Sequence, residues 1–349
     1  MKLARTATAC VVAVALTMLT IPITAEAAPA ERGRAKLCPL AEARPPAVER
    51  ISGADRYEVA VHASEKSYPA GSNLVFLASG TGFADALSGS AAAGVKDAPV
   101  LLVPRDTVPK TVLDEIVRLA PSEIVILGGP ASISAALEQS LQYLPGTVSR
   151  FGGADRYEVA AQVARWAFTA SDIIYIASGE KFPDALSAGA AAGDWGVPVL
   201  LTTKDGVPDA TLDVIRDDDA LENIIVVGGP ATISDSVVTE LSAFAPVSRV
   251  EGADRYAVSA ATSAQAFCAV LPTVYVASGE VFPDALSGSA AAIAAGSPVL
   301  LVARDSIPAT VVTEMKRLDP MQIEVLGGPN TISQDVVDAL HTYLRGETH

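Results

Sequence analysis

The sequence has few residues of the kinds that build metal centres and nucleophilic active sites. Only three histidines and three cysteines occur in 349 residues, and no Cys/His ligand spacing is present. The chain also lacks a G-x-G-x-x-G fingerprint, a P-loop and a G-x-S-x-G elbow. We therefore expect no cofactor and no resident metal. The histidines do not follow the repeat described below, and we interpret them as surface residues: His62, His341 and His349.

Basic residues are the minority among the charged ones. Lys and Arg number 25 against 40 Asp and Glu, which gives a formal net charge of −15. An excess of acid of this size argues against nonspecific binding to nucleic acid. It also means that any anionic ligand must meet local basic groups, or be bridged to the protein by divalent cations.

Long apolar runs are confined to the start of the chain. Lys2 and Arg5 precede an apolar run at residues 11–23, and Ala-Glu-Ala at 25–27 forms a small-x-small cleavage site. This pattern predicts a signal peptide over residues 1–27, followed by a linker over 28–46. Removing residues 1–27 takes away Lys2, Arg5 and Glu26 and leaves a net charge of −16. We expect a secreted protein with no membrane contact after cleavage.

The cysteines leave two readings open. Cys10 is removed with the signal peptide, whereas Cys38 and Cys268 remain. In an oxidising compartment these two could form a disulfide. Cys268 lies in an apolar segment, so a buried free thiol is an equal alternative.

What the chain does have is one pattern in three copies. Gly-Ala-Asp-Arg-Tyr occurs at residues 53–57, 153–157 and 252–256, and Ala-Ser-Gly at 78–80, 177–179 and 277–279. An apolar residue followed by Gly-Gly-Pro occurs at 127–130, 227–230 and 326–329. These phrases predict three repeats, over 47–146, 147–245 and 246–349. An enzyme normally needs one asymmetric site, whereas three near-equal units favour multivalent binding.

Each repeat is expected to be a small α/β unit. In the first repeat, strands are predicted over 48–51, 74–78, 100–103 and 124–127, and helices over 55–67, 83–94, 109–119 and 134–144. Short apolar runs joined by helices indicate a parallel sheet covered on both faces. The helix over 83–94 consists mainly of Ala, Gly and Ser. Because so little side-chain bulk allows close approach, we expect these helices to pack centrally and hold the three units together.

Three sets of repeated polar residues are candidates for binding. The Gly-Ala-Asp-Arg-Tyr arginines could grip acidic groups, although the preceding Asp is also a typical helix N-cap. The Asp of the strand-to-helix turn after Ala-Ser-Gly could bind hydroxyls or a cation, or could fill the anion position at the helix start itself. A basic residue ends each third strand and is followed by Asp. The candidates are Arg56, Arg156 and Arg255; Asp85, Asp184 and Asp284; and Arg105, Lys204 and Arg304.

The ordered motifs resemble the cell-wall-binding repeat type 2 family over essentially the whole mature chain. The resemblance implies three Toprim-like or Rossmann-like parallel-sheet repeats in a pseudo-threefold arrangement. It also implies an exported protein of a Gram-positive bacterium, held non-covalently at the cell surface by an anionic secondary wall polymer. Family members commonly carry a separate effector domain, and the sequence shows none. Departures from the shared pattern include Ala84 in repeat one, where the other repeats have Pro, and Ala188 and Val227 in repeat two.

The leading interpretation is a secreted, non-catalytic cell-wall-binding protein. One alternative is a wall-active hydrolase that uses Asp85, Asp184 or Asp284 with a nearby serine. The other is a self-associating surface or coat protein. No repeat carries a distinguishing polar constellation, which counts against the hydrolase.

Overall fold

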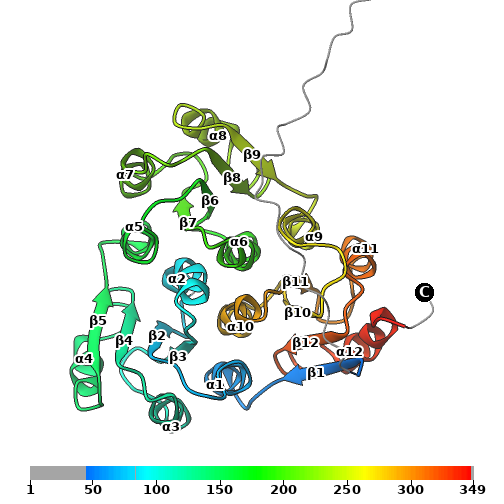
Figure 1. Cartoon of the computed structure of the whole chain (residues 1–349), viewed down its shortest axis with the longest axis horizontal. Coiled ribbons are helices and arrows are strands. Elements are labelled where there is room, and N and C mark those ends of the chain that lie inside the picture. Colours follow the sequence, from blue (N-terminus) through cyan, green and yellow to red (C-terminus); the bar gives the residue numbers. More distant parts are fainter. Residues whose placement is uncertain (1–44, 83, 347–349) are drawn as a thin grey trace, which may run out of the picture. The chain divides into compact units, whose positions relative to one another are not determined.

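The computed structural model describes residues 45–82 and 84–346, in which strands and helices alternate along the chain (Figure 1). The predicted signal peptide and nearly all of the predicted linker lie outside these residues. In repeat one the elements are β1 (Ala47–Ile51), α1 (Arg56–Ser67), β2 (Leu74–Ser79), α2 (Ala84–Val95), β3 (Val100–Val103), α3 (Lys110–Leu119), β4 (Glu123–Leu127) and α4 (Ala135–Leu141). These confirm the eight predicted elements. Their bounds differ by one residue at most, except that the last helix ends earlier than predicted.

The other repeats follow the same order. Repeat two contains β5 (Thr147–Phe151), α5 (Arg156–Ala167), β6 (Ile173–Ser178), α6 (Phe182–Trp195), β7 (Val199–Thr202), α7 (Asp209–Asp217), β8 (Asn223–Val227) and α8 (Asp235–Leu241). Repeat three contains β9 (Val247–Val250), α9 (Arg255–Ala266), β10 (Thr273–Ser278), α10 (Pro283–Ala294), β11 (Val299–Val302), α11 (Ala309–Leu318), β12 (Gln322–Leu326), α12 (Gln334–Leu340) and the short η1 (His341–Tyr343).

The strands form three parallel four-stranded sheets, and each sheet is shared between two repeats. The orders are β3-β2-β4-β5, β7-β6-β8-β9 and β1-β12-β10-β11. The first strand of every repeat therefore extends the sheet of the preceding repeat. The expected α/β unit is therefore composite, because each sheet takes three strands from one repeat and an edge strand from the next. The arrangement is cyclic, because β1 pairs with β12. The paired residues run from Ala47 opposite Gln322 to Ile51 opposite Leu326.

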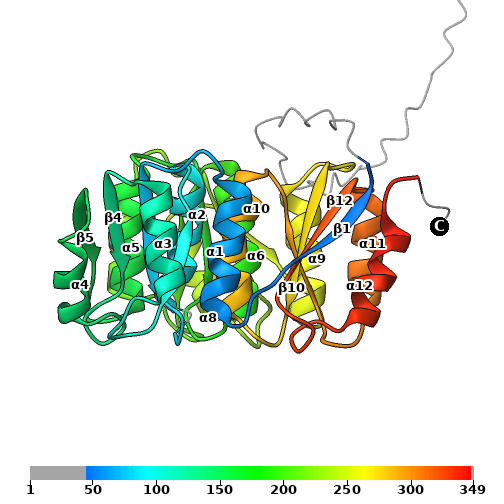
Figure 2. The same cartoon turned by 90° about the horizontal axis from the view of Figure 1, so that it is seen from below.

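The first helix of each repeat likewise packs against the preceding repeat. Helix α5 packs on α2, α9 packs on α6, and α1 packs on α10. We call these contacts, with the shared strands, the first junction (repeats one and two), the second junction (two and three) and the closing junction (three and one). Figure 2 shows strands and helices standing roughly parallel to one another between two rims of loops. The carboxyl ends of the parallel strands in each sheet share one edge.

The small-residue helices α2, α6 and α10 contact one another at the centre of Figure 1, as the composition predicts. At one equivalent position on these helices, two repeats have glycine and the third has isoleucine. The residues are Gly94 in α2, Gly193 in α6 and Ile293 in α10. A Cβ added to Gly94 would lie 2.0 Å from Cγ2 of Ile293, and one added to Gly193 would lie 2.5 Å from its Cδ1. A single isoleucine therefore occupies the space that the two glycines leave.

Cys268 is disulfide-bonded, and the other two cysteines lie outside the described residues. No helix in the described part of the chain has the length and hydropathy needed to cross a membrane.

Candidate functional site at the repeat junctions

The Gly-Ala-Asp-Arg-Tyr motif starts the first helix of each repeat. The Oδ1 atom of Asp55 accepts hydrogen bonds from the backbone N–H groups of Tyr57 (2.9 Å) and Glu58 (3.0 Å), and Asp155 and Asp254 do the same in their repeats. This is an N-cap, which satisfies donors that have no partner inside the helix. The aspartate of the motif therefore has a structural role.

The arginine of the motif reaches the loop that follows the second strand of its own repeat. Nη1 of Arg56 donates to the carbonyl oxygen of Gly80, and Arg156 and Arg255 donate to the equivalent glycines, Gly179 and Gly279. A Cβ on Gly80 would lie 2.6 Å from Cε1 of Tyr57 and 3.1 Å from Cδ of Arg56. The glycine of Ala-Ser-Gly is required because the tyrosine and the arginine lie directly against the loop backbone.

The aspartate at the start of α2 lies beneath the Gly-Gly-Pro turn of its own repeat. Asp85 Oδ2 accepts a hydrogen bond from Ser132 Oγ at 2.6 Å, and a Cβ on Gly128 would lie 2.2 Å from the same oxygen. Gly128 also has a φ of +100°, a conformation that other residues rarely adopt. The carboxylate therefore fills the space under the turn.

The equivalent carboxylates in repeats two and three lie close to an arginine of the following repeat. Burial raises the pKa of Asp184 to about 6, while a hydrogen bond from Thr232 and the charge of Arg255 oppose this rise. Burial likewise raises the pKa of Asp284, while a hydrogen bond from Thr331 and the charge of Arg56 oppose this rise. Asp184 is 6% exposed and Asp284 7%. The structure thus brings two of the predicted sets together across the junctions, with Arg156 and Asp85 at the equivalent positions of the first junction.

A second set of arginines, which the sequence analysis missed, lies at the same places. Arg50 on β1 donates to the carbonyl oxygen of Gly327 at 2.7 Å. Arg150 and Arg249 donate to Gly128 and Gly228, both at 2.6 Å. Each of these arginines precedes Gly-Ala-Asp-Arg-Tyr by three residues, so their spacing could have identified them. Each junction therefore combines two arginines of one repeat with the Gly-Gly turn and the carboxylate of the repeat before it.

The third predicted set lies at the rim of the same edge. Arg105 and Arg304 each form an ion pair at 2.8 Å with the aspartate that follows them, and about half of each arginine side chain is exposed. Lys204 is exposed as well. The backbone carbonyls at these positions accept from the N–H of the serine before the last helix, at 2.8 Å in every repeat. The set is therefore beside the Gly-Gly-Pro loop and exposed to solvent.

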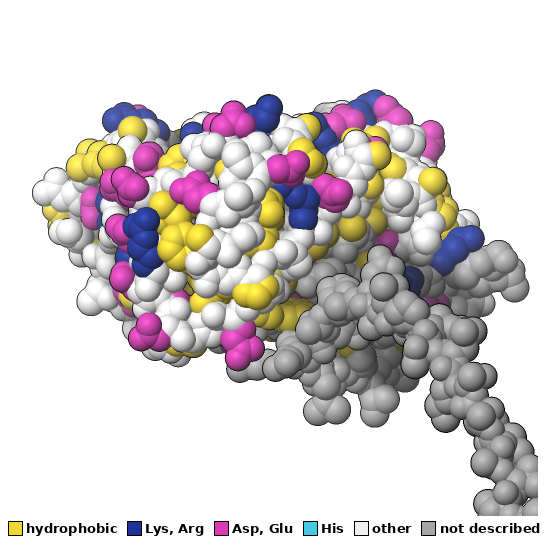
Figure 3. Space-filling view, turned by 90° about the horizontal axis from the view of Figure 1, so that it is seen from above, with side chains coloured by type: hydrophobic (Ala, Val, Ile, Leu, Met, Phe, Trp, Pro, Cys, Tyr) yellow, Lys and Arg dark blue, Asp and Glu magenta, His cyan; other side chains and the backbone are white. Residues whose placement is uncertain are grey.

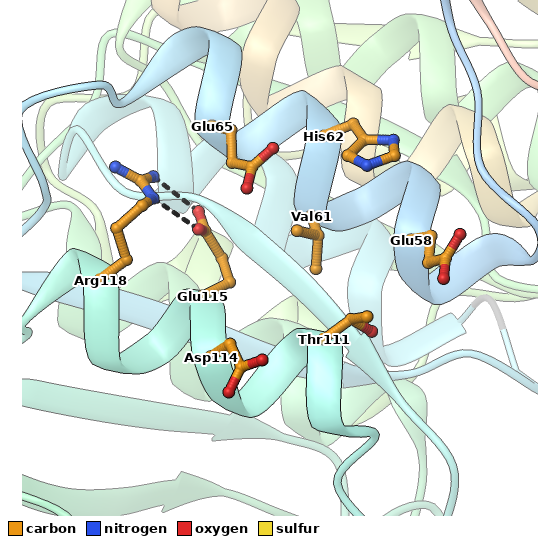
Figure 4. Close-up of a pocket in the computed structure, with 8 residues that line it drawn as sticks. All are labelled: Glu58, Val61, His62, Glu65, Thr111, Asp114, Glu115 and Arg118. Carbon is orange, nitrogen blue, oxygen red and sulfur yellow. Dashed lines mark hydrogen bonds and ion pairs between the residues drawn. The ribbon is translucent and has the colours of Figure 1, made fainter.

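A groove of about 350 Å³ lies elsewhere, between α1 and α3 (Figure 4). It is lined by Glu58, Val61, His62, Glu65, Thr111, Asp114, Glu115 and Arg118. Arg118 forms a bidentate ion pair with the buried Glu115, which also accepts from Ser64. A groove in repeat two overlaps the equivalent place only in part, at Arg165, Val214 and Asp217, and is otherwise lined by other positions. No group of three or more His, Cys, Asp and Glu residues in the described chain could hold a metal ion.

Figure 3 shows the distribution of charge on one face of the molecule. On the described part of this face, acidic and basic side chains are interspersed with apolar ones. On this face an anionic ligand would thus depend on individual basic side chains and not on a broad basic field.

Comparison with known proteins places this chain in a family. A sequence profile of cell wall binding domain 2 (CWB2) matches residues 50–138, 150–238 and 249–337. The chain belongs to the CWB2 family. The three matched segments begin at the first-strand arginines, Arg50, Arg150 and Arg249.

Relatives of this CWB2 chain include larger proteins. It is 32% identical over 292 residues to the amidase enhancer of Bacillus subtilis, covering 84% of this chain and 40% of that protein. It is 28% identical over 301 residues to the N-acetylmuramoyl-L-alanine amidase LytC of the same organism, covering 86% and 59%. The chain thus spans between two fifths and three fifths of these relatives.

Solved structures give the same picture of the fold. Cwp6 from Clostridium difficile matches with a TM-score of 0.81 and 27% identity, over 87% of this chain and 48% of that one. Cwp8 from the same organism matches with a TM-score of 0.78 and 22% identity, over 85% and 51%. The three-repeat α/β arrangement is therefore shared with these proteins.

Proposed function

We propose that this CWB2 protein attaches non-covalently to an anionic secondary polymer of the cell wall, outside the cell and without catalysis. The observation that carries the proposal is that each of the three junctions contains two arginines of one repeat. Guanidinium groups held in place by carbonyl oxygens still present further N–H donors to a phosphate or carboxylate. Arg56, Arg156 and Arg255 are the proposed contacts, flanked at the rim by Arg105, Lys204 and Arg304.

Three sites on one body suit a repeating polymer. When one site has bound, the next anionic groups of the same polymer chain are already at high local concentration near the other two sites. Each junction can therefore be weak while the whole protein binds firmly. The net negative charge of the chain therefore does not prevent binding of an anionic polymer, since attachment needs only short-range contacts at the junctions.

The buried aspartates are better suited to positioning than to catalysis. Asp184 and Asp284 are almost fully buried, so a bulky polymer could not reach their carboxylates, and the half-buried Asp85 lies under the equivalent glycine turn. We infer that they hold the junction arginines and the turn in place. An amidase and an amidase enhancer both contain a segment similar to this chain, which supports a common wall-binding segment more than a common catalytic centre.

The test is a pull-down of the protein with purified cell walls, before and after acid extraction of the secondary polymers. We expect binding to be lost with the polymer. The triple variant R56Q/R156Q/R255Q should also lose most of its binding. Its matched control is K110Q/R165Q/R216Q, which removes the same charge from exposed positions other than the junction arginines.

Two further arms keep the result interpretable. Because the junction arginines also bond to backbone, circular dichroism must show that the triple variant folds, and R105Q/K204Q/R304Q provides a second test at exposed positions. Binding abolished by EDTA would favour divalent cations as bridges between polymer and carboxylates. No binding to intact walls would refute the proposal and favour self-association.

A further inference from the structure

We propose that the three junction sites are unequal, and that the closing junction, which holds Arg50 and Arg56, is the primary anion subsite. This inference rests on the proposed function. It follows from side chains that differ between the junctions although the backbone arrangement is the same. Three separate differences point in the same direction.

The first difference concerns the arginine on the first strand. At the first junction Arg150 pairs with Glu138 at 2.9 Å, and at the second Arg249 pairs with Asp235 at 3.1 Å. At the closing junction, the hydrogen bonds described for Arg50 go to the carbonyl oxygens of Gly327 and Ser333. Arg50 is partly buried, and this burial lowers the pKa of its guanidinium. An arriving anion would meet a guanidinium that no neighbouring carboxylate is shown to neutralise.

The positions that supply those carboxylates explain this difference. The residue equivalent to Glu138 in repeat three is Val337, and the residue equivalent to Asp235 is Gln334. Neither carries a charge. The last helix of repeat three therefore lacks both of the acids that pair with the first-strand arginine at the other junctions.

The second difference lies in the loop after Ala-Ser-Gly. Arg255 donates to Gly279, and the next residue, Glu280, accepts from the Tyr256 hydroxyl at 3.5 Å. In repeat two Glu180 occupies the same position, and its charge contributes, after burial, to raising the pKa of Tyr157. Repeat one has the neutral Thr81 instead. The junction arginine of repeat one thus has no acid at this loop position.

The third difference lies above the Gly-Gly turn. At the second junction, Glu251 Oε2 would lie 3.7 Å from a Cβ added to Gly229. At the closing junction, nothing described lies within 4 Å of a Cβ added to Gly328, and Ser52 replaces the glutamate. The space beside the second glycine of the turn is therefore less filled at the closing junction.

These differences set an order. Of the extra acids just described the closing junction has none, and its Glu58 is shared by the first junction as Glu158 and replaced at the second by Ala257. The first junction adds Glu138 and Glu180, with Lys181 beside the latter, and the second has Asp235, Glu251 and Glu280. A carboxylate close to a bound anion repels it, and in a partly exposed site each such charge should change affinity by about three- to tenfold. Affinity should therefore fall from the closing to the first to the second junction.

The experiment is a titration of the folded, isotope-labelled protein with inorganic phosphate, followed by NMR. The backbone amides of Gly80, Gly179 and Gly279 report on the closing, first and second junctions respectively. We expect the Gly80 signal to saturate at the lowest phosphate concentration. T81E should weaken the closing site by about fivefold and leave the other two unchanged. E251S/E280T should strengthen the second site by a similar factor or more.

The outcomes separate the two proposals. Equal affinities at the three reporters, or a T81E variant that binds like the wild type, would overturn the inequality and leave the proposed function standing. Phosphate shifts at none of the reporters would count against the anion sites themselves. Because Thr81, Glu251 and Glu280 are exposed, these variants should fold, so that a changed affinity can be read directly.

Discussion

The closing junction and the first junction have the same backbone arrangement but are held by different chemistry. At the closing junction Lys66 at the end of α1 bridges Glu49 of β1 and Glu324 of β12, with both N–O distances 2.5 Å. At the first junction the residue equivalent to Lys66 is Trp166. Its ring packs on Phe76 (centroids 5.9 Å apart) and on Phe151 (5.2 Å).

The difference shows how a repeated sequence can select one closed arrangement. Consecutive repeats are tethered, so a nondirectional apolar contact is enough to join them. Repeats three and one are joined by segments about 277 residues apart in sequence, as in the hydrogen bond from Arg50 to Gly327. If α1 and β1 packed in the place of α5 and β5, Lys66 would keep Glu49 but would face Val125 in place of the buried Glu324. We infer that the ion pair specifies the partner of α1, a role for which buried charges are suited.

The largest predicted effect is at the first junction. W166A removes a partly buried ring that packs against two others. Truncation of a large aromatic side chain in a packed site should lower the free energy of unfolding by about 3 kcal/mol. Urea denaturation would measure it. A loss below about 1 kcal/mol would show that the aromatic cluster does not hold the first junction.

The ion pair at the closing junction should give the second largest effect. K66A removes the ammonium beside Glu324, whose side chain is 4% exposed. Because Lys66 itself is about one third exposed, we expect a loss of about 2 kcal/mol, less than for a fully buried pair.

The control for K66A is the double variant K66M/E324V. Valine stands at the equivalent position, Val125, in repeat one. The double variant should be within about 1 kcal/mol of the wild type. If the role of the pair is specificity, this variant should also form more oligomers in light scattering, because α1 can then pack on other partners. A monomer as uniform as the wild type would contradict that role.

These contrasts also show what the sequence could predict. The elements, the parallel sheets, the central helices and the caps follow from local patterns, because motifs such as Asp55 before a helix act within a few residues. The sharing of β1 with β12 could not be inferred, since a repeated strand fits its own sheet and its neighbour's equally well. The sequence identifies Arg56 and Asp284 as separate candidates. It does not show that they lie close together, because their proximity at the closing junction depends on the sharing of β1 with the sheet of repeat three.

A smaller effect compares the central helices at the two junctions. G94A places a Cβ 2.0 Å from Ile293 of α10, whereas a Cβ at Gly189 in α6 would lie 3.5 Å from Ser90 of α2. We expect G94A to cost about 1–2 kcal/mol through overpacking, and G189A to be neutral or to stabilise the helix by about 0.5 kcal/mol. In an I293A background, G94A should become harmless. Thermal denaturation of the four variants tests this, and equal effects of G94A and G189A would contradict it.

The smallest predicted effect concerns pH at the second junction. Burial raises the pKa of Asp184 from 3.8 to about 6, so the folded protein keeps a proton there that the unfolded chain has already released. Between about pH 4 and 6 the folded state binds more protons at this position, and its contribution to stability must fall as pH rises through that window. D184N cannot titrate and keeps an acceptor for Thr232. Its stability relative to the wild type should therefore rise, by on the order of 1 kcal/mol, from pH 4 to pH 7. D284N should behave alike at the closing junction, where burial raises the pKa of Asp284 too. Denaturation at several pH values would measure this. If the free energies of unfolding of wild type and D184N differ by the same amount at every pH in this range, the carboxylate is better solvated, or more strongly held by Arg255, than its burial implies.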